Sequence, residues 1–384
     1  MAKITKKKLK AQPTVCFPST LESEKLTGKL YGYFIENTNF YNITSILSND
    51  INKKQVDICE VFKEKPAQNL SDKLTGYYDE KGVLQFITPD NILCKKEPYS
   101  LKLDVFSRNI GILESDLMLK TGAMMIGCGS VGSLAALSLA KAGVGRFLLI
   151  DNDIVGYHNI CRHQCGIYDV GKYKTEAVKE RILQINPTAK VIVQNTIVQD
   201  VPISIFNEFC DKDTIVIGGA DNREGDLYAA HIAKEVGMPL MSIGCWERAF
   251  AGEIFYSLPD GMPDYSDFMW AIGETSGRTT QNRKFYTNEE DLAKAAFEPG
   301  ISVDIDFVTI IAVKLAIDIL NRNNQNYSPR LINHLSQYTL ICNTNNPNIG
   351  GENAEIFSYP LQVTTSIEVP YSQKDKELHN NNNK

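Results

Sequence analysis

The stretch that decides the fold is residues 124–153, "MMIGCGSVGSLAALSLAKAGVGRFLLIDND". It consists of an apolar run, a glycine turn, a helix of small residues, a second apolar run and an acid. Gly127, Gly129 and Gly132 give G-x-G-x-x-G between a predicted strand and a predicted helix. The first glycine allows the tight turn, the second lets a phosphate approach the backbone, and the third lets the helix pack on the strand. The start of the helix then offers free N–H groups and a positive dipole end to a phosphate.

Asp151 closes the second apolar run, nineteen residues after the last glycine. In dinucleotide-binding folds a carboxylate at this place accepts hydrogen bonds from the ribose hydroxyls. The turn and Asp151 together predict a site for an adenine nucleotide, and taken alone they would favour a nicotinamide cofactor.

Strands and helices alternate beyond residue 121. Apolar runs of strand length recur at 122–127, 146–151, 190–195, 214–221 and 239–244. Helical spacing predicts helices over 130–142 and 174–185, a helix that ends at Val236, and an amphipathic helix from about Asp304 to Leu320. This alternation predicts an α/β protein with a doubly wound, Rossmann-like, mostly parallel sheet.

Changes in composition along the chain suggest five segments. We expect a flexible tail over 1–12, a smaller N-terminal accessory module over 13–100, the alternating domain over 101–330, a C-terminal β extension over 331–370 and a disordered tail over 371–384. The accessory module carries short β-type runs between polar turns and no chemical motif, which predicts an α+β or β-rich unit for packing or docking. The last segment is charged and rich in asparagine, which favours disorder.

The bulk composition excludes several classes of function. A chain of 384 residues with a net charge of −6 argues against a nucleic-acid-binding surface as its main role. Its nine cysteines are scattered without framework spacing, and no signal segment is evident at the start, so we expect reduced thiols in a cytoplasmic protein. No apolar stretch is long enough to predict a membrane span.

Polar residues downstream of the glycine turn change the expected ligand. Asn159 and Arg162 follow the ribose acid, Lys174 begins a predicted helix, and Asp221 ends a later strand, where ligands of doubly wound sheets bind. Two cations and an extra carboxylate are superfluous for hydride transfer, but they suit a triphosphate and its metal. Each residue also has a simpler interpretation: Arg162 as a surface cation, Lys174 as a solvated lysine, and Asp221 as a helix N-cap.

In this order and at these intervals, the motifs resemble the adenylating enzymes that activate ubiquitin and ubiquitin-like proteins, together with the bacterial ThiF and MoeB proteins. The resemblance runs from about Phe106 to about Leu320. It rests on Ser107-Arg108-Asn109, the three glycines, Asp151, Asn159-Ile160-Cys161-Arg162-His163, Asp169-Val170-Gly171-Lys172-Tyr173-Lys174, Ile185-Asn186-Pro187 and Asp221-Asn222.

The resemblance implies that residues 101–330 adenylate the C-terminal carboxylate of a ubiquitin-like protein, with ATP and Mg²⁺ as cofactors and a conjugating enzyme as a further partner. It assigns Arg162 and Lys174 to the triphosphate, Asp221 to Mg²⁺ and Asp151 to the ribose. Asn159 would orient a phosphate or its neighbours. Asp153 is expected to be structural.

Arg108 lies in a segment whose Val105, Ile112 and Leu119 recur on one helical face, so we expect an amphipathic helix before the first strand. In the family, the arginine of this segment reaches the ATP phosphates of the other protomer. The resemblance therefore implies a homodimer with two composite sites. The alternative is a solvated arginine on that helix.

The sequence departs from the family at its structural zinc. Asp264 and Asp267 stand where the first pair of zinc cysteines would be, and no C-x-x-C occurs anywhere, which excludes a four-thiolate zinc. Cys161 and Cys165, with two histidines nearby, form an alternative cluster that we disfavour because the same segment is assigned to ATP.

The family's thioester cysteine usually lies on a loop after the zinc segment, but residues 269–299 contain no cysteine. Cys245 is nearest to the predicted site, although its neighbours resemble a buried strand end. Three routes stay open: Cys245 acts as the nucleophile, a cysteine elsewhere does, or the adenylate passes directly to a nucleophile of a partner.

The favoured function is activation of a ubiquitin-like protein in a bacterial conjugation system, for which antiphage defence is suggested by analogy alone. The alternatives are a related enzyme acting on a peptide, a small carboxylate or a modified tRNA, and an inactive scaffold. A nicotinamide oxidoreductase is the last alternative.

Overall fold

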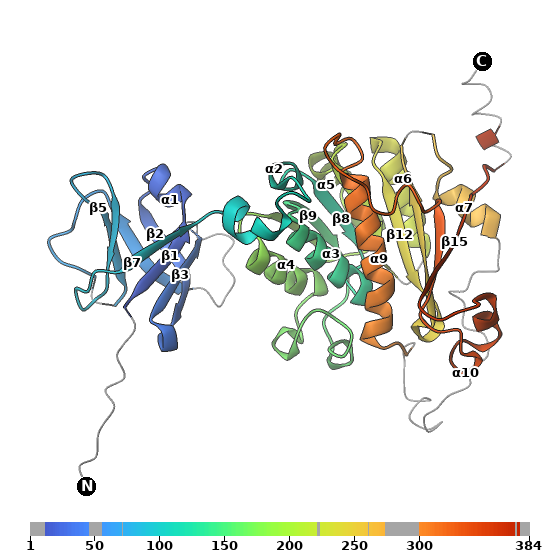
Figure 1. Cartoon of the computed structure of the whole chain (residues 1–384), viewed down its shortest axis with the longest axis horizontal. Coiled ribbons are helices and arrows are strands. Elements are labelled where there is room, and N and C mark those ends of the chain that lie inside the picture. Colours follow the sequence, from blue (N-terminus) through green and yellow to red (C-terminus); the bar gives the residue numbers. More distant parts are fainter. Residues whose placement is uncertain are drawn as a thin grey trace, which may run out of the picture. The chain divides into compact units, whose positions relative to one another are not determined.

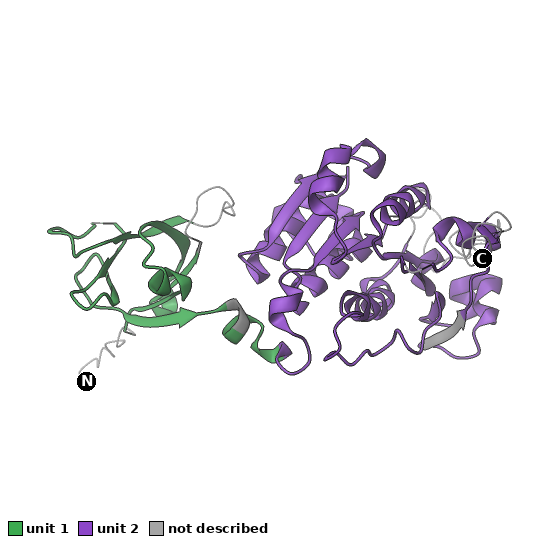
Figure 2. Ribbon diagram, turned by 90° about the horizontal axis from the view of Figure 1, so that it is seen from above, with its two compact units in different colours: residues 1–108 green, residues 109–384 purple. Residues whose placement is uncertain are grey.

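The structure is a computed structural model that describes residues 12–45, 56–70, 72–220, 223–259, 261–272, 299–372 and 375–376. The chain divides into two compact units, residues 1–108 and residues 109–384 (Figure 2). The polar stretch 273–288 lies outside the described residues, as do residues 1–11 of the expected N-terminal tail and most of the expected C-terminal tail.

The first unit is built on one seven-stranded sheet in the order β6-β5-β4-β2-β3-β1-β7. Its strands are β1 (Thr14–Pro18), β2 (Gly28–Ile35), β3 (Phe40–Ser45), β4 (Val56–Phe62), β5 (Leu74–Tyr78), β6 (Leu84–Ile87) and β7 (Lys95–Tyr99). Alternate residues of β1 point into the core, where Val15 and Phe17 are fully buried beside Leu21 of the short helix α1 (Thr20–Ser23). The unit is thus β-rich.

The second unit contains an eight-stranded sheet in the order β10-β9-β8-β11-β12-β13-β14-β15 (Figure 1). Its strands are β8 (Gly122–Ile126), β9 (Arg146–Ile150), β10 (Lys190–Gln194), β11 (Thr214–Gly218), β12 (Leu240–Cys245), β13 (Ala251–Ser257), β14 (Tyr338–Cys342) and β15 (Gln362–Ile367). The strands β8 to β12 are parallel, and β13 to β15 continue the sheet antiparallel. The predicted doubly wound, mostly parallel α/β fold is confirmed.

Helices cover both faces of this sheet because neighbouring residues of each buried strand point to opposite sides. Met125 joins the core under α3, α4 and α9, whereas Met124 joins the core under α5, α6 and α7. The helices are α3 (Ser130–Ala142), α4 (Lys174–Ile185), α5 (Ile203–Phe209), α6 (Arg223–Val236), α7 (Tyr265–Ile272) and α9 (Ser302–Leu320). The long helix α9 packs along α3 (Figure 1). No helix among the described residues is long and apolar enough to cross a membrane.

The amphipathic helix expected around Arg108 does not form, so that prediction is wrong. The segment consists of a π-type turn over Leu101–Val105, a 3-10 turn over Ser107–Asn109 and the four-residue helix α2 (Ser115–Met118). Gly111 interrupts it with a φ of +82°, which an α-helix cannot contain. Ile112, expected on one helical face with Val105 and Leu119, is 55% exposed.

Candidate active site

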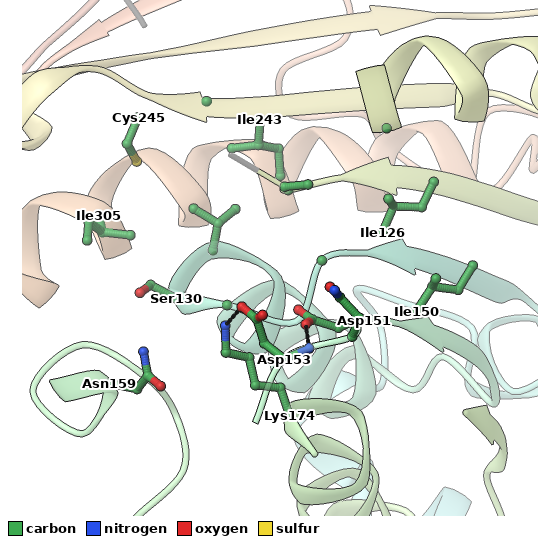
Figure 3. A pocket seen from close by; sticks show the side chains of 18 of the residues that line it. Ile126, Ser130, Ile150, Asp151, Asp153, Asn159, Lys174, Ile243, Cys245 and Ile305 are labelled. Atoms are coloured by element: carbon green, nitrogen blue, oxygen red, sulfur yellow. Dashed lines mark hydrogen bonds and ion pairs between the residues drawn. The ribbon is translucent and has the colours of Figure 1, made fainter. Parts of the chain in front are cut away.

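A cavity of about 730 Å³ opens at the carboxyl ends of β8, β9, β11 and β12. In the sheet, β8 has β9 and β10 on one side and β11 and β12 on the other, so the direction in which strands are added reverses at β8. Ligands of doubly wound sheets bind at such a switch point. Residues predicted from the sequence that line the cavity are Gly127, Gly129, Asp151, Asn159, Arg162, Lys174 and Cys245. Figure 3 labels, among other lining residues, Asp151, Asp153, Asn159, Lys174 and Cys245.

The three glycines of the turn differ in what surrounds them. Gly127 has a φ of +86°, and a Cβ there would lie 3.0 Å from the main-chain nitrogen of Ala220. At Gly132 a Cβ would lie 1.9 Å from the carbonyl oxygen of Gly127, so helix α3 can sit this close to the turn only with glycine. A Cβ at Gly129 would meet nothing within 4 Å. The open side of the turn is therefore at Gly129, where a phosphate could approach.

Asp151 braces the turn from the end of β9. Its Oδ2 accepts a hydrogen bond from the N–H of Cys128 at 2.6 Å, and its Oδ1 accepts one from the N–H of Asp153 at 2.8 Å. A carboxylate oxygen can accept more than one hydrogen bond, so Asp151 can also receive ribose hydroxyls.

Lys174, the first residue of α4, is held at the cavity by Asp153. Its Nζ lies 2.6 Å from Asp153 Oδ2, and its main-chain N–H donates to the Asp153 carbonyl at 2.9 Å. The Lys174 side chain is only 11% exposed, whereas that of Asp153 is 61% exposed (Figure 3). An incoming phosphate would therefore compete with Asp153 for a cation that is already in position.

Arg162 reaches the cavity from a short turn organised by Asn159. The Oδ1 of Asn159 accepts a hydrogen bond from the N–H of Gly156 at 2.8 Å, and its carbonyl accepts one from the N–H of Arg162 at 3.0 Å. The guanidinium lies beside the chain that leads into α9, since a Cβ at Gly300 would be 3.7 Å from Arg162 Nη1. Asn159 thus shapes the turn that carries the second cation.

The D-x-G-x-x-K segment is tied to α4 by the carboxylate of Asp169, which is 3% exposed. Asp169 accepts hydrogen bonds from Arg181 Nη2 at 2.8 Å, the Gly166 N–H at 2.9 Å and Lys172 Nζ at 3.0 Å. Burial alone would raise the pKa of Asp169, but these donors outweigh it and lower the pKa to about 2. The motif therefore anchors the loop before Lys174.

The ThiF family matches residues 104–351, which is more than half of the chain. The chain belongs to the ThiF family.

The chain is also similar in sequence to curated proteins with different printed functions. It is 31% identical over 161 residues to a "Probable molybdopterin-synthase adenylyltransferase" of Porphyra purpurea, covering 41% of this chain and 40% of that protein. It is 33% identical over 137 residues to a tRNA threonylcarbamoyladenosine dehydratase of Bacillus subtilis, covering 35% and 52%. It is 28% identical over 169 residues to ubiquitin-like modifier-activating enzyme 5 of Xenopus laevis, covering 41% and 42%. These matches span about half or less of each relative's length.

Among solved structures, E. coli MccB crystallised with ATP is similar with a TM-score of 0.49 and 18% identity, over 70% of this chain and 73% of that one.

Within this ThiF-type unit, Cys245 ends β12 and lines the cavity on the side away from Lys174 (Figure 3). The side chain is partly exposed. Its proposed nucleophilic role stays a prediction.

Other residues singled out in the sequence are not among those described as lining the cavity. Asp221 and its neighbour Asn222 lie outside the described residues. Arg108 lies in the 3-10 turn that ends the first unit, and its expected role concerns a second protomer.

Sequence reasoning missed the loop 196–199, which follows β10 and also lines the cavity. The rule that the carboxyl ends of parallel strands face one crevice could have located it. It also missed Trp246 and Glu247 after β12, which continue the lining beyond Cys245. No motif distinguishes these residues in the sequence.

Asp264 and Asp267, which we expect at the positions of the family's zinc cysteines, are engaged within the protein. Asp264 Oδ2 lies 2.7 Å from Lys234 Nζ, and Asp267 accepts hydrogen bonds from the N–H groups of Asp264 and Ser372. With Asp375 they form the one group of potential metal ligands found in the part of the chain that the structure describes. The alternative cluster around Cys161 is therefore not assembled.

Proposed function

We propose that this protein is an ATP-dependent adenylyltransferase that activates the C-terminal carboxylate of a ubiquitin-like protein. The observation that carries the proposal is the gathering of the open glycine turn, Asp151, Lys174 and Arg162 around one cavity at the switch point. A dinucleotide cofactor needs the first two features. The two cations favour a ligand with the higher charge of a triphosphate.

The reaction needs little from the protein beyond charge and position. A C-terminal carboxylate is already ionised at neutral pH, so no general base has to act. One of its oxygens attacks the α-phosphorus of ATP, the acyl–adenylate bond forms, and the bond to pyrophosphate breaks. Arg162 and Lys174 would offset the negative charge gathered on the phosphates, and the glycine turn would orient them.

The donor set fits Mg²⁺ as the metal that accompanies ATP. Carboxylates of Asp151, Asp153 and Glu224 line the cavity, and hard oxygen ligands suit Mg²⁺. We assign Asp221 as its protein ligand on the basis of the motif. The ion would neutralise part of the charge of the triphosphate.

A ubiquitin-like carrier and a conjugating-enzyme partner are the finer part of the proposal, together with a role in a bacterial conjugation system that defends against phage. They are supported by the motif order and by the similarity to ubiquitin-like modifier-activating enzyme 5. The similarity to a tRNA threonylcarbamoyladenosine dehydratase keeps a modified tRNA as the second candidate substrate. Peptides, small carboxylates and an inactive scaffold remain alternatives.

ATP–pyrophosphate exchange tests the proposal. The purified protein is mixed with ATP, labelled pyrophosphate and candidate ubiquitin-like carriers, each compared with the same carrier amidated at its C-terminus. Exchange that requires the free carboxylate is the expected result. Exchange driven instead by tRNA or a small carboxylate would contradict the carrier assignment. ATP binding without exchange would indicate a scaffold, and binding of NAD but not ATP would indicate an oxidoreductase.

A further inference from the structure

His163 is a buried imidazole beside the candidate site to which the proposed reaction gives no role. The residue is 7% exposed, and both ring nitrogens have partners. Nδ1 accepts the main-chain N–H of Cys165 at 3.1 Å, so the ring proton must be on Nε2. Nε2 therefore donates to the carbonyl oxygen of Cys128 at 2.6 Å. These contacts define a neutral ring with one tautomer.

The carbonyl that His163 holds belongs to the glycine turn. The carbonyl of Cys128 and the N–H of Gly129 share one planar trans peptide, in which they point in opposite directions. Fixing the carbonyl toward His163 therefore fixes the Gly129 N–H toward the other side. Gly129 lines the cavity at the open side of the turn. The N–H of Cys128 is held separately by Asp151, so the peptides on both sides of Cys128 have fixed orientations.

The same ring fixes the segment that carries Arg162. The main-chain N–H groups of Arg162 and His163 both donate to the carbonyl of Asn159, at 3.0 Å and 2.8 Å. His163, which directly follows Arg162 in the chain, is thus bound to the glycine turn through its own side chain. The hydrogen bond from His163 to Cys128 therefore links two parts of the cavity lining, the glycine turn at Gly129 and the turn that carries Arg162.

The ring has to stay neutral for this arrangement. Burial lowers the pKa of His163, and so does the charge of Lys174 on α4. Asp151 at the end of β9 and Asp169 in the 3-10 turn over Ile167–Asp169 act in the opposite direction, as does the carbonyl of Cys128. Protonation would place a second proton on Nδ1, where it would face the N–H of Cys165.

We propose that His163 is a positioning residue for the triphosphate, which aims the Gly129 N–H and Arg162 at the phosphates through its bond to Cys128. The inference rests on the proposed function, because it assumes that ATP is the ligand of the cavity.

Two substitutions distinguish the hydrogen bond from His163 to the Cys128 carbonyl, called the tether below, from the local hydrogen bond between His163 and the Cys165 N–H. His163→Gln can keep a donor where Nε2 stands, and so retain the bond to Cys128 without a titrating group. His163→Asn can keep an acceptor where Nδ1 stands, and so retain the bond to the Cys165 N–H while losing the tether. We expect His163→Asn to weaken ATP binding about tenfold, the scale of one buried hydrogen bond, and His163→Gln to stay within about threefold of wild type. Calorimetric titration with ATP measures both, and melting temperatures check folding.

The pH profile provides the readout that a purely structural role would not change. Below about pH 6.5, wild-type affinity for ATP should fall more steeply than that of His163→Gln, because a glutamine side chain cannot take up the proton that the imidazole gains. Protonation of ATP itself affects both proteins alike. Parallel profiles, or ATP affinity of His163→Asn equal to wild type, would overturn the inference. If ATP binds as expected but no carrier supports exchange, the proposed function fails while the role of His163 stands. If wild type does not bind ATP, both fail.

Discussion

Lys174 and Arg162 reach the cavity from two separate segments, one at the start of α4 and one in the turn after β9. We expect Lys174→Ala and Arg162→Ala each to lower kcat/KM for carrier-dependent pyrophosphate exchange by roughly 10² or more, the scale for losing one charge stabiliser. Lys179→Ala on the same helix is the matched control, because Lys179 does not line the cavity. A loss below tenfold for both site variants would favour an inactive scaffold.

Asp169 has a folded-state pKa of about 2 against an ordinary value of 3.8. A carboxyl group whose pKa is lower in the folded than in the unfolded state stabilises the fold. The stabilisation is complete at pH values above the unfolded-state pKa and is lost as the pH falls through the folded-state pKa. At pH 7, Asp169→Asn should lower the free energy of unfolding by about 2 kcal/mol. The difference from wild type should shrink between about pH 4 and pH 2.

Urea unfolding of both proteins at several pH values measures this difference. Asp200→Asn serves as the control because Asp200 is an exposed carboxylate. A deficit of Asp169→Asn that does not change with pH would show that the carboxylate charge is not what anchors the loop.

At the scale of elements, two glycines in the strand–turn–helix unit of β8 and α3 are expected to serve different purposes: Gly132 allows close packing, and Gly129 leaves room for the ligand. Gly132→Ala would press a methyl group against the Gly127 carbonyl, so we expect a loss of roughly 1–3 kcal/mol in stability. Gly129→Ala should leave the melting temperature nearly unchanged, since the site is open and its φ of −73° suits alanine. It should still weaken ATP binding, because the methyl group enters the space of the phosphate.

Thermal unfolding and ATP titration of the two glycine variants test this division. If Gly129→Ala binds ATP as wild type does, the phosphate does not approach the turn at this residue. An unchanged melting temperature for Gly132→Ala would mean that α3 can move away from β8 at little cost.

At the scale of the whole molecule, we propose a homodimer in which Arg108 acts on the ATP of the other protomer. The expected helix around Arg108 is replaced by short turns, so this proposal now rests on the family resemblance alone. A cation supplied by a second protomer would make each site composite, because neither subunit would then neutralise the triphosphate by itself.

Mixing Arg108→Ala subunits with Asp221→Ala subunits tests the composite site. Each homodimer should be inactive, whereas a mixed dimer carries one site with both residues intact and should recover exchange activity. Subunit exchange must be verified with tagged chains. A mixture that stays inactive, or an active protein that migrates as a monomer, would refute the arginine in trans.

Local features of the chain were sufficient to determine the parallel half of the sheet. The helices over 130–142 and 174–185 appear with the predicted bounds, because small and apolar residues at helical spacing lie between well-defined turns. The glycine turn was equally readable, since its geometry depends on steric contacts within one strand–turn–helix unit. The failure around Arg108 has a local cause as well, namely the positive φ of Gly111.

Only the tertiary structure decided which side chains meet. The sequence alone did not indicate that Asp153 holds Lys174, 21 residues away, or that His163 holds Cys128, 35 residues away. It also gave no sign that β13 and β14 extend the sheet antiparallel. Periodicity and turn chemistry act between near neighbours in the chain, whereas these pairings depend on strand order, which brings distant segments to the same edge of the sheet.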